Sequence, residues 1–315
     1  MRKVLFATTA LVALGGVSAA SADLSISASN EFKYTSWSDN YAALANANKS
    51  DFANTSTIKI SASSVTDNGL SMSSYAEADG TNGAFDDIGF SIAGDFGTLG
   101  FGGSEAGDKF ATATDVTPDE GNSLTPAHAA LTVLPADEQV DASTVSYLSP
   151  DISGFQFAAG LNDSDGASDG ASFGGQYSMT SGDATVTVKY ATSDGKKANT
   201  ADTATEATSM GLVVAYGDMT LTMAENTKTT ATADFSAQSV GVTYAMNDSM
   251  TVSAYTGETE DGKDATHEMS DTGFGAAYTI TPGLVLNVTY NDWSLKDGSV
   301  AQDGSKTAVA LNLSF

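Results

Sequence analysis

The stretch "TAVALNLSF" (307–315) decides the fold, because its apolar and small polar residues alternate up to the last position of the chain. Successive residues of a β-strand project from opposite faces of a sheet. One face of this stretch is apolar and carries Val309, Leu311, Leu313 and Phe315. Chain ends are ordinarily frayed and polar. A regular strand at the terminus therefore predicts that the end of the chain pairs with another strand.

The same alternation recurs along the sequence and predicts sixteen strands. Seven of the connections are tight and rich in Gly, Asn, Asp and Pro, which tight turns require. The other eight are expected to be long and acidic, for example 194–206, 258–270 and 295–304. The expected strands lie near 23–37, 53–66, 70–79, 86–93, 98–104, 143–149, 154–163, 170–180, 184–193, 207–216, 219–227, 234–246, 249–258, 271–281, 283–294 and 305–315.

A soluble β-sandwich would also alternate, but three features favour a barrel in a membrane. The polar face is small and neutral in the strand centres, whereas charge gathers in the loops. The strands reach about 10 residues, the length that a tilted strand needs to cross a bilayer. Short turns at one rim and long loops at the other are typical of outer-membrane barrels. An open edge would leave backbone groups unpaired in lipid. We therefore expect an all-β, sixteen-stranded antiparallel transmembrane β-barrel closed by its first and last strands.

The first 22 residues have the three parts of a secretory signal peptide. Arg2 and Lys3 form a positive region, 4–17 is mostly apolar, and 20–22 is a small-x-small cleavage site. The apolar run is too short to cross a membrane as a helix. Cleavage would leave one barrel domain at 23–315.

The charge balance excludes one large class of partner. Of the 13 basic residues, two precede residue 23, which leaves 11 lysines against 39 acidic residues and a formal charge of −28. A chain with so few cations has no basic patch, so no nucleic-acid partner is expected. Cysteine is absent, which excludes disulfides, and the export signal alone indicates the compartment.

One connection is out of scale, namely 105–142 between the fifth and sixth strands, and a loop of this length is functional or disordered. A disordered insert would have fewer apolar residues. We therefore expect the loop to fold inward and pack on the barrel wall through Phe110, Val116, Leu124, Leu131, Val133 and Leu134. Its acidic residues are Glu105, Asp108, Asp115, Asp119, Glu120, Asp137, Glu138 and Asp141, against the cations Lys109 and, if protonated, His128.

Two segments carry a resemblance to a known family. They are "GDFGTLGFGG" (94–103), before the long loop, and "TVSYLSPDISGFQFAAGLND" (144–163), after it. With the signal peptide and the terminal "LNLSF", the chain resembles the Gram-negative general porins, most closely those of alphaproteobacteria. The resemblance implies a barrel of the outer membrane, usually a homotrimer, with no cofactor. It also implies a third loop that folds into the lumen and passive diffusion of ions and small hydrophilic solutes.

The sequence departs from that family at Gly103, where such porins often have an arginine, and the mature part has no arginine at all. The arginine cluster usual on the wall opposite the loop is therefore absent. Alternation places the candidate wall residues on the polar face; they are Glu31, Lys33, Lys59, Asp87, Lys189 and Lys306. Because acidic residues dominate the loop, we expect a lumen that enriches cations and repels anions.

Other functions have less support in the sequence. No "GxSxG" elbow appears, and the glycine-rich stretches lack a following helix, so no enzyme is expected. The run 162–170 offers Asp163, Asp165 and Asp169 as candidate ligands for structural Ca²⁺ or Mg²⁺, without the spacing of an EF-hand. An exported acidic structural or adhesive β-protein stays an alternative, although no internal repeat is found. A substrate-specific outer-membrane channel is the other.

The terminal Phe315 has an expected role in biogenesis. With alternate apolar residues before it, it resembles the signal that the outer-membrane assembly machinery reads. The expected partners are thus two further copies of the chain, outer-membrane lipid, that machinery, and small hydrophilic solutes and cations.

Overall fold

The computed structural model describes residues 23–39, 50–80, 85–102, 108–113, 116–117, 144–164, 168–197, 204–230, 233–263, 267–298 and 300–315. The expected signal peptide and most of the loop 105–142 lie outside these residues. No helix among them is long and apolar enough to span a bilayer.

The prediction of sixteen antiparallel strands is confirmed. The elements are β1 (Asp23–Asp39), β2 (Ser50–Val65), β3 (Ser71–Asp79), β4 (Phe85–Gly94), β5 (Gly97–Gly102), η1 (Asp108–Phe110), β6 (Thr144–Leu148), β7 (Phe155–Ser164), β8 (Ser168–Ser181), β9 (Ala184–Lys197), β10 (Ala204–Tyr216), β11 (Met219–Thr229), β12 (Asp234–Asn247), β13 (Met250–Asp261), β14 (His267–Thr281), β15 (Leu284–Asp297) and β16 (Val300–Ser314).

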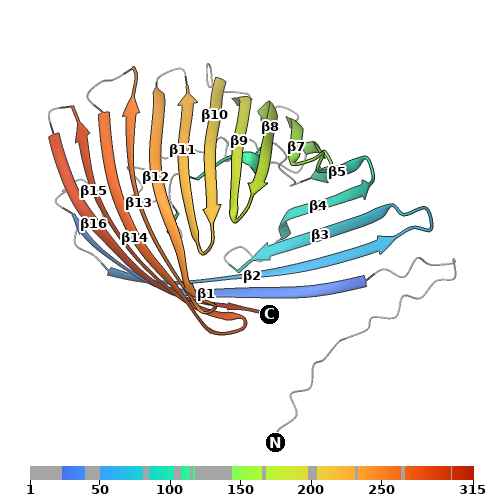
Figure 1. Cartoon of the computed structure of the whole chain (residues 1–315), viewed down its shortest axis with the longest axis horizontal. Helices are drawn as coiled ribbons and strands as arrows, with labels where there is room; N and C mark the ends of the chain where they lie inside the picture. The colour runs from blue at the N-terminus through green and yellow to red at the C-terminus, as the bar shows by residue number, and fades with distance from the viewer. Residues whose placement is uncertain are drawn as a thin grey trace, which may run out of the picture.

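The strands form one closed barrel in which each pairs with its neighbours in sequence and β1 pairs with β16. The closing register runs from Ser29 opposite Ser314 to Asp39 opposite Gly304. The backbone N–H of Phe315 donates to the carbonyl oxygen of Ala28 at 2.9 Å, so pairing continues to the last residue. The expectation from the terminal alternation is therefore met, and the C-terminus lies beside β1 in Figure 1.

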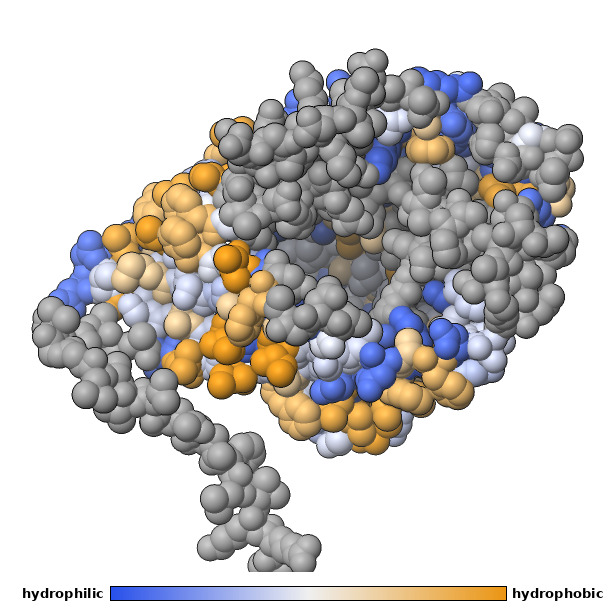
Figure 2. Space-filling view, turned by 180° about the vertical axis from the view of Figure 1, so that it is seen from behind, coloured by the Kyte–Doolittle hydropathy of each residue, from blue (hydrophilic) through white to orange (hydrophobic). Residues whose placement is uncertain are grey.

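The two faces of the sheet differ as the alternation predicts. In β16, Val309 and Leu311 are exposed, whereas Ala308 and Ala310 between them are buried. The buried face is the interior, because Phe110 of η1 packs on Ala158, which belongs to it. Figure 1 shows η1 within the ring of strands. The outer surface carries exposed apolar side chains, which gather in patches in Figure 2.

Three connections expected to be long are mostly strand, which corrects the sequence prediction. The stretches 194–206, 258–270 and 295–304 are largely taken up by the ends of β9 and β10, β13 and β14, and β15 and β16. Their described outward residues are mostly polar, as with Glu258 and Lys296. The backbone ladder therefore continues past the apolar belt, where the hydrophobic alternation that marks a half-buried strand is no longer present.

The turn between β6 and β7 shows why one rim is tight. Gly154 has a φ of +89°, and a Cβ there would lie 2.2 Å from the carbonyl oxygen of Ser178. Only glycine adopts this conformation without steric cost. The N–H of Gly154 donates to Oδ1 of Asp151 at 2.9 Å, which holds the turn.

Candidate functional site

The start of the long loop lies on the inner wall of the barrel. Phe110, at the end of η1, is 1% exposed and packs against Ala158 of β7 and Ala191 of β9, with Leu148 at the edge. Small wall residues thus leave room for a large ring from the loop. The packing expected of Phe110 from its apolar character is observed.

Hydrogen bonds continue this attachment toward β11. The backbone N–H of Thr112 donates to Oγ of Ser209 on β10 at 2.9 Å, and Nδ2 of Asn226 on β11 donates to the carbonyl oxygen of Thr112 at 3.1 Å. Ser209 and Asn226 are fully buried. A loop backbone inside a barrel needs such partners, because buried polar groups are costly when unpaired. Further along the loop, the side chain of Val116 lies against Gly241 of β12.

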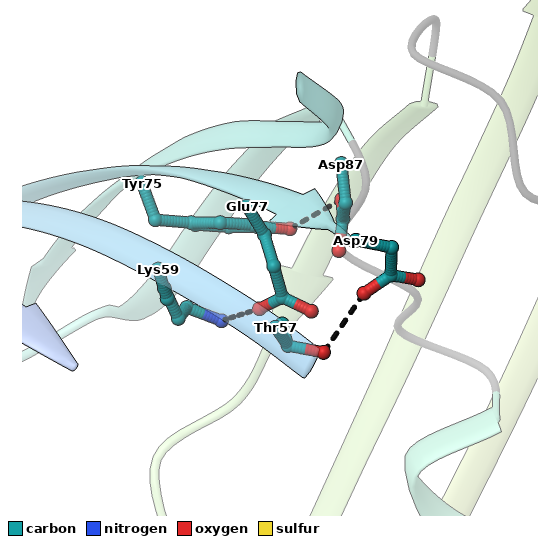
Figure 3. Close-up of polar contacts among 6 residues, drawn as sticks. All are labelled: Thr57, Lys59, Tyr75, Glu77, Asp79 and Asp87. Carbon is teal, nitrogen blue, oxygen red and sulfur yellow. Dashed lines mark hydrogen bonds and ion pairs between the residues drawn. The ribbon is translucent and has the colours of Figure 1, made fainter. Parts of the chain in front are cut away.

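A charged cluster lies on another part of the inner wall, on β2, β3 and β4. Nζ of Lys59 lies 3.1 Å from Oε2 of Glu77, and Oγ1 of Thr57 donates to Oδ1 of Asp79 at 2.8 Å. The wall cluster comprises these four residues and the pair next to them, so its members are Thr57, Lys59, Tyr75, Glu77, Asp79 and Asp87, drawn in Figure 3.

Tyr75 connects the two halves of the wall cluster. Its hydroxyl donates to Oδ1 of Asp87 at 3.0 Å, and Nζ of Lys59 lies 4.3 Å from the centre of its ring. Tyr75 is directly opposite Gly89 of β4, where a Cβ would lie 2.9 Å from Cε1 of the ring. The missing side chain at Gly89 therefore lets the ring lie across β4 and reach the carboxylate (Figure 3).

The wall cluster has an excess of negative charge. It holds one lysine and three carboxylates, and only Glu77 forms an ion pair with the lysine. Asp79 and Asp87 accept hydrogen bonds from uncharged hydroxyls, and no described lysine lies within ion-pair distance of them. Among the described residues, no cation thus neighbours these two formal negative charges on the inner wall, and they can attract mobile cations.

The lysines of the barrel seam do not add free positive charge. Nζ of Lys33 lies 3.2 Å from Oε1 of Glu31 on the same strand, β1. Lys306, a predicted wall cation, is only 5% exposed, and its Nζ lies 5.3 Å from the ring centre of Trp37. The register explains the burial, because Lys306 is directly opposite Trp37 and Asn291.

A second tyrosine repeats the arrangement of Tyr75. The hydroxyl of Tyr255 donates to Oδ2 of Asp271 at 2.5 Å and accepts a hydrogen bond from Nδ2 of Asn291 at 2.9 Å. Tyr255 is opposite Gly273, where a Cβ would lie 2.0 Å from Cε1 of its ring. In both places a ring occupies the space over a glycine and reaches an aspartate two residues before it.

Sequence reasoning found only part of this wall. It named Glu31, Lys33, Lys59, Asp87 and Lys189, and all five lie on strands with the inward register. It missed Glu77, Asp79 and the whole set around Asp271. The same alternation that selected Asp87 would have selected Glu77 and Asp79 in "SMSSYAEAD", whereas the tyrosine–glycine contacts depend on register.

Several predicted loop residues lie outside the described part of the chain. Lys109 is exposed in η1, and Asp108 is described there by its backbone alone. The others outside the described residues are Glu105, Asp115, Asp119, Glu120, Asp137, Glu138 and Asp141.

The candidate metal ligands stay a prediction. Asp163 and Asp169 are opposite each other on β7 and β8, but only their backbones are described, and Asp165 lies outside the described residues. Among the residues that the structure describes, no group of three or more acidic or histidine side chains could hold an ion.

A closed barrel with an apolar exterior, a polar interior and a loop attached inside is the architecture of an outer-membrane channel. Residues 7–298 match the family model described as Gram-negative porin, and the chain belongs to that family. It is therefore a porin of the Gram-negative outer membrane, and both family and fold point to a channel rather than an enzyme.

Solved structures of porins and of another outer-membrane protein share the fold at low sequence identity. The anion-selective porin from Comamonas acidovorans is 15% identical with a TM-score of 0.66, over 94% of this chain and 100% of that one. A porin structure refined at 1.8 Å is 16% identical with a TM-score of 0.66, over 93% and 100%. OmpT of Vibrio cholerae in its trimer form is 13% identical with a TM-score of 0.69, over 93% and 99%. A search of curated proteins finds no match.

Proposed function

We propose that this porin is cation-selective and passes ions and small hydrophilic solutes by passive diffusion. The observation that carries the proposal is the wall cluster, in which Asp79 and Asp87 are bonded to hydroxyls and only Glu77 has a cationic partner. Fixed negative charges that line a narrow aqueous passage raise the local concentration of cations and repel anions.

The lysines of the barrel seam and of the wall cluster do not oppose this effect. Lys33 and Lys59 each lie within 3.2 Å of a glutamate, so each contributes to an approximately neutral pair. Lys306 is buried under Trp37 and is not offered to a passing anion. The mature chain has no arginine, and its acidic residues outnumber its lysines by 39 to 11, as counted above.

The reversal potential of the purified channel in a KCl gradient tests the proposal. We expect a reversal potential between zero and the equilibrium potential of K⁺. It should move toward zero in Asp79→Asn and in Asp87→Asn, because each substitution removes a negative charge from the wall. Asp292→Asn is the matched control, since Asp292 also accepts from a tyrosine, Tyr290 at 3.3 Å, but on the outer face. Equal permeability to K⁺ and Cl⁻ in the unmodified channel would refute the proposal.

We also propose that the porin assembles as a homotrimer. The support is the fold shared with OmpT of Vibrio cholerae, for which a trimer form is known. The mass of the detergent-solubilised protein, with the detergent subtracted, tests this directly. A mass of one chain in every detergent that preserves the barrel would count against it.

A further inference from the structure

Two inner-wall glycines lie under side chains of the long loop. A Cβ added at Gly211 on β10 would lie 1.9 Å from Oγ1 and 2.6 Å from Cβ of Thr112. A Cβ added at Gly241 on β12 would lie 2.5 Å from Cγ2 and 3.0 Å from Cγ1 of Val116. In each case the loop side chain occupies the space that any other wall residue would fill.

The wall under Phe110 is built on the same plan. Ala158 and Ala191 are fully buried beneath the ring, so larger residues there would collide with it. The three contact sites between loop and wall follow the order of the chain, with Phe110 over β7 and β9, Thr112 over β10 and Val116 over β12. The loop residues thus pack on a row of glycine and alanine residues of the wall, which extends from β7 to β12.

Glycine inside a strand lowers its stability and often marks a close approach of another backbone. At Gly211 and Gly241 the approaching groups are loop side chains, since the atoms nearest to an added Cβ belong to Thr112 and Val116. Neither glycine has a left-handed backbone conformation, because neither is among the residues with a positive φ. Backbone geometry therefore does not require glycine at these two positions, and the packing of the loop does.

We propose that Gly211 and Gly241 are positioning residues that set how far the long loop projects into the lumen, and hence the conductance of the channel. Heavy atoms in ordinary contact are about 3.5–4.0 Å apart, so a methyl group at either position would displace the loop by roughly 1 Å or more. The displacement is toward the pore axis, because the wall is on the other side. The proposal assumes an open channel and is independent of the proposed ion selectivity.

Single-channel conductance of Gly211→Ala and Gly241→Ala tests this. We expect both to conduct less than the unmodified channel, with an unchanged reversal potential. Removing the opposing atoms from the loop should restore conductance, as Gly211→Ala/Thr112→Gly and Gly241→Ala/Val116→Ala, with each loop variant also measured alone. Wild-type conductance in both folded glycine variants would overturn the proposal, as would double variants no better than the single ones.

Gly175→Ala is the matched control for adding a methyl group to a strand. Gly175 lies on the outer face of β8, and its added Cβ would meet nothing closer than 3.2 Å. Its conductance should equal that of the unmodified channel. A fall in conductance in Gly175→Ala equal to that in the two inner variants would also overturn the proposal.

If the glycine variants do not fold, a disulfide crosslink tests the contact between Val116 and Gly241. The chain has no cysteine, so Val116→Cys/Gly241→Cys introduces one pair, and the 2.5 Å contact brings the two Cβ atoms within reach of a disulfide. Oxidation of the folded barrel should form it rapidly and leave the conductance nearly unchanged. A folded double variant that stays reduced, or whose conductance falls on oxidation, would contradict the packing of Val116 on Gly241.

Discussion

A charged side chain of the wall can affect passing ions while contributing little to the stability of the fold. Lys59 and Glu77 form an ion pair with side chains 40% and 28% exposed. Solvent screens such a pair, which is worth about 0–1 kcal/mol to folding. Its effect on passing ions does not depend on that small energy, because the field in the lumen depends on the number of charges.

Lys59→Gln is therefore predicted to raise the ratio of K⁺ to Cl⁻ permeability, since it removes the only cation of the wall cluster. Reversal potentials measure the ratio. Lys296→Gln is the control, because Lys296 has the same kind of partner, Glu268 at 3.3 Å, on the outer face. A fall in the ratio, or an equal change in both variants, would show that the wall cluster does not control selectivity.

Phe110→Ala is predicted to loosen the loop without unfolding the barrel. Truncating a buried phenylalanine costs about 3–5 kcal/mol in a protein core, and here the loss falls on the contact between loop and wall. We expect noisier open-channel current and unchanged heat resistance of the folded barrel. Quiet current at the unmodified level would mean that the ring does not hold the loop.

At the scale of the element, β16 closes the barrel through a register of eleven residue pairs with β1. Phe315 adds one backbone hydrogen bond at the end of that ladder, and its side chain is 77% exposed. The ring therefore contributes little to the finished barrel, which is consistent with a role during assembly.

Deleting Phe315 is accordingly predicted to impair insertion in cells more than synthesis or export. Pulse-labelling followed by the heat-modifiable gel shift separates these steps, and refolding of the purified variant into detergent should stay near normal. Phe315→Tyr keeps an aromatic terminus and serves as the control. Normal insertion of the deletion variant would contradict the expected role of this residue.

At the scale of the whole molecule, the proposed selectivity would arise from the electric field inside the barrel and should therefore depend on salt. The Debye length falls from about 10 Å at 0.1 M to about 3 Å at 1 M. We predict that the ratio of K⁺ to Cl⁻ permeability falls as the mean KCl concentration rises over this range, at a constant gradient. A ratio independent of salt would indicate selection by contact or by size in place of charge.

Some features of the barrel could be read from local pattern and others could not. The alternation in 307–315 correctly predicted the closing strand, and that of 155–161 placed β7. The predicted length of the loop 194–206 was wrong, because beyond the apolar belt both faces of a strand are polar and the alternation is lost. The burial of Lys306 could not be read from its place on the polar face, because it depends on Trp37 across the seam.

The sequence by itself determined the number of strands, the closure of the sheet and the face on which each side chain lies. These follow from a period of two, which is a property of neighbouring residues. Only the tertiary structure decided that Tyr75 lies over Gly89 and Thr112 over Gly211. Such contacts depend on register and on the path of a loop across six strands, and a shift of one residue would change every partner.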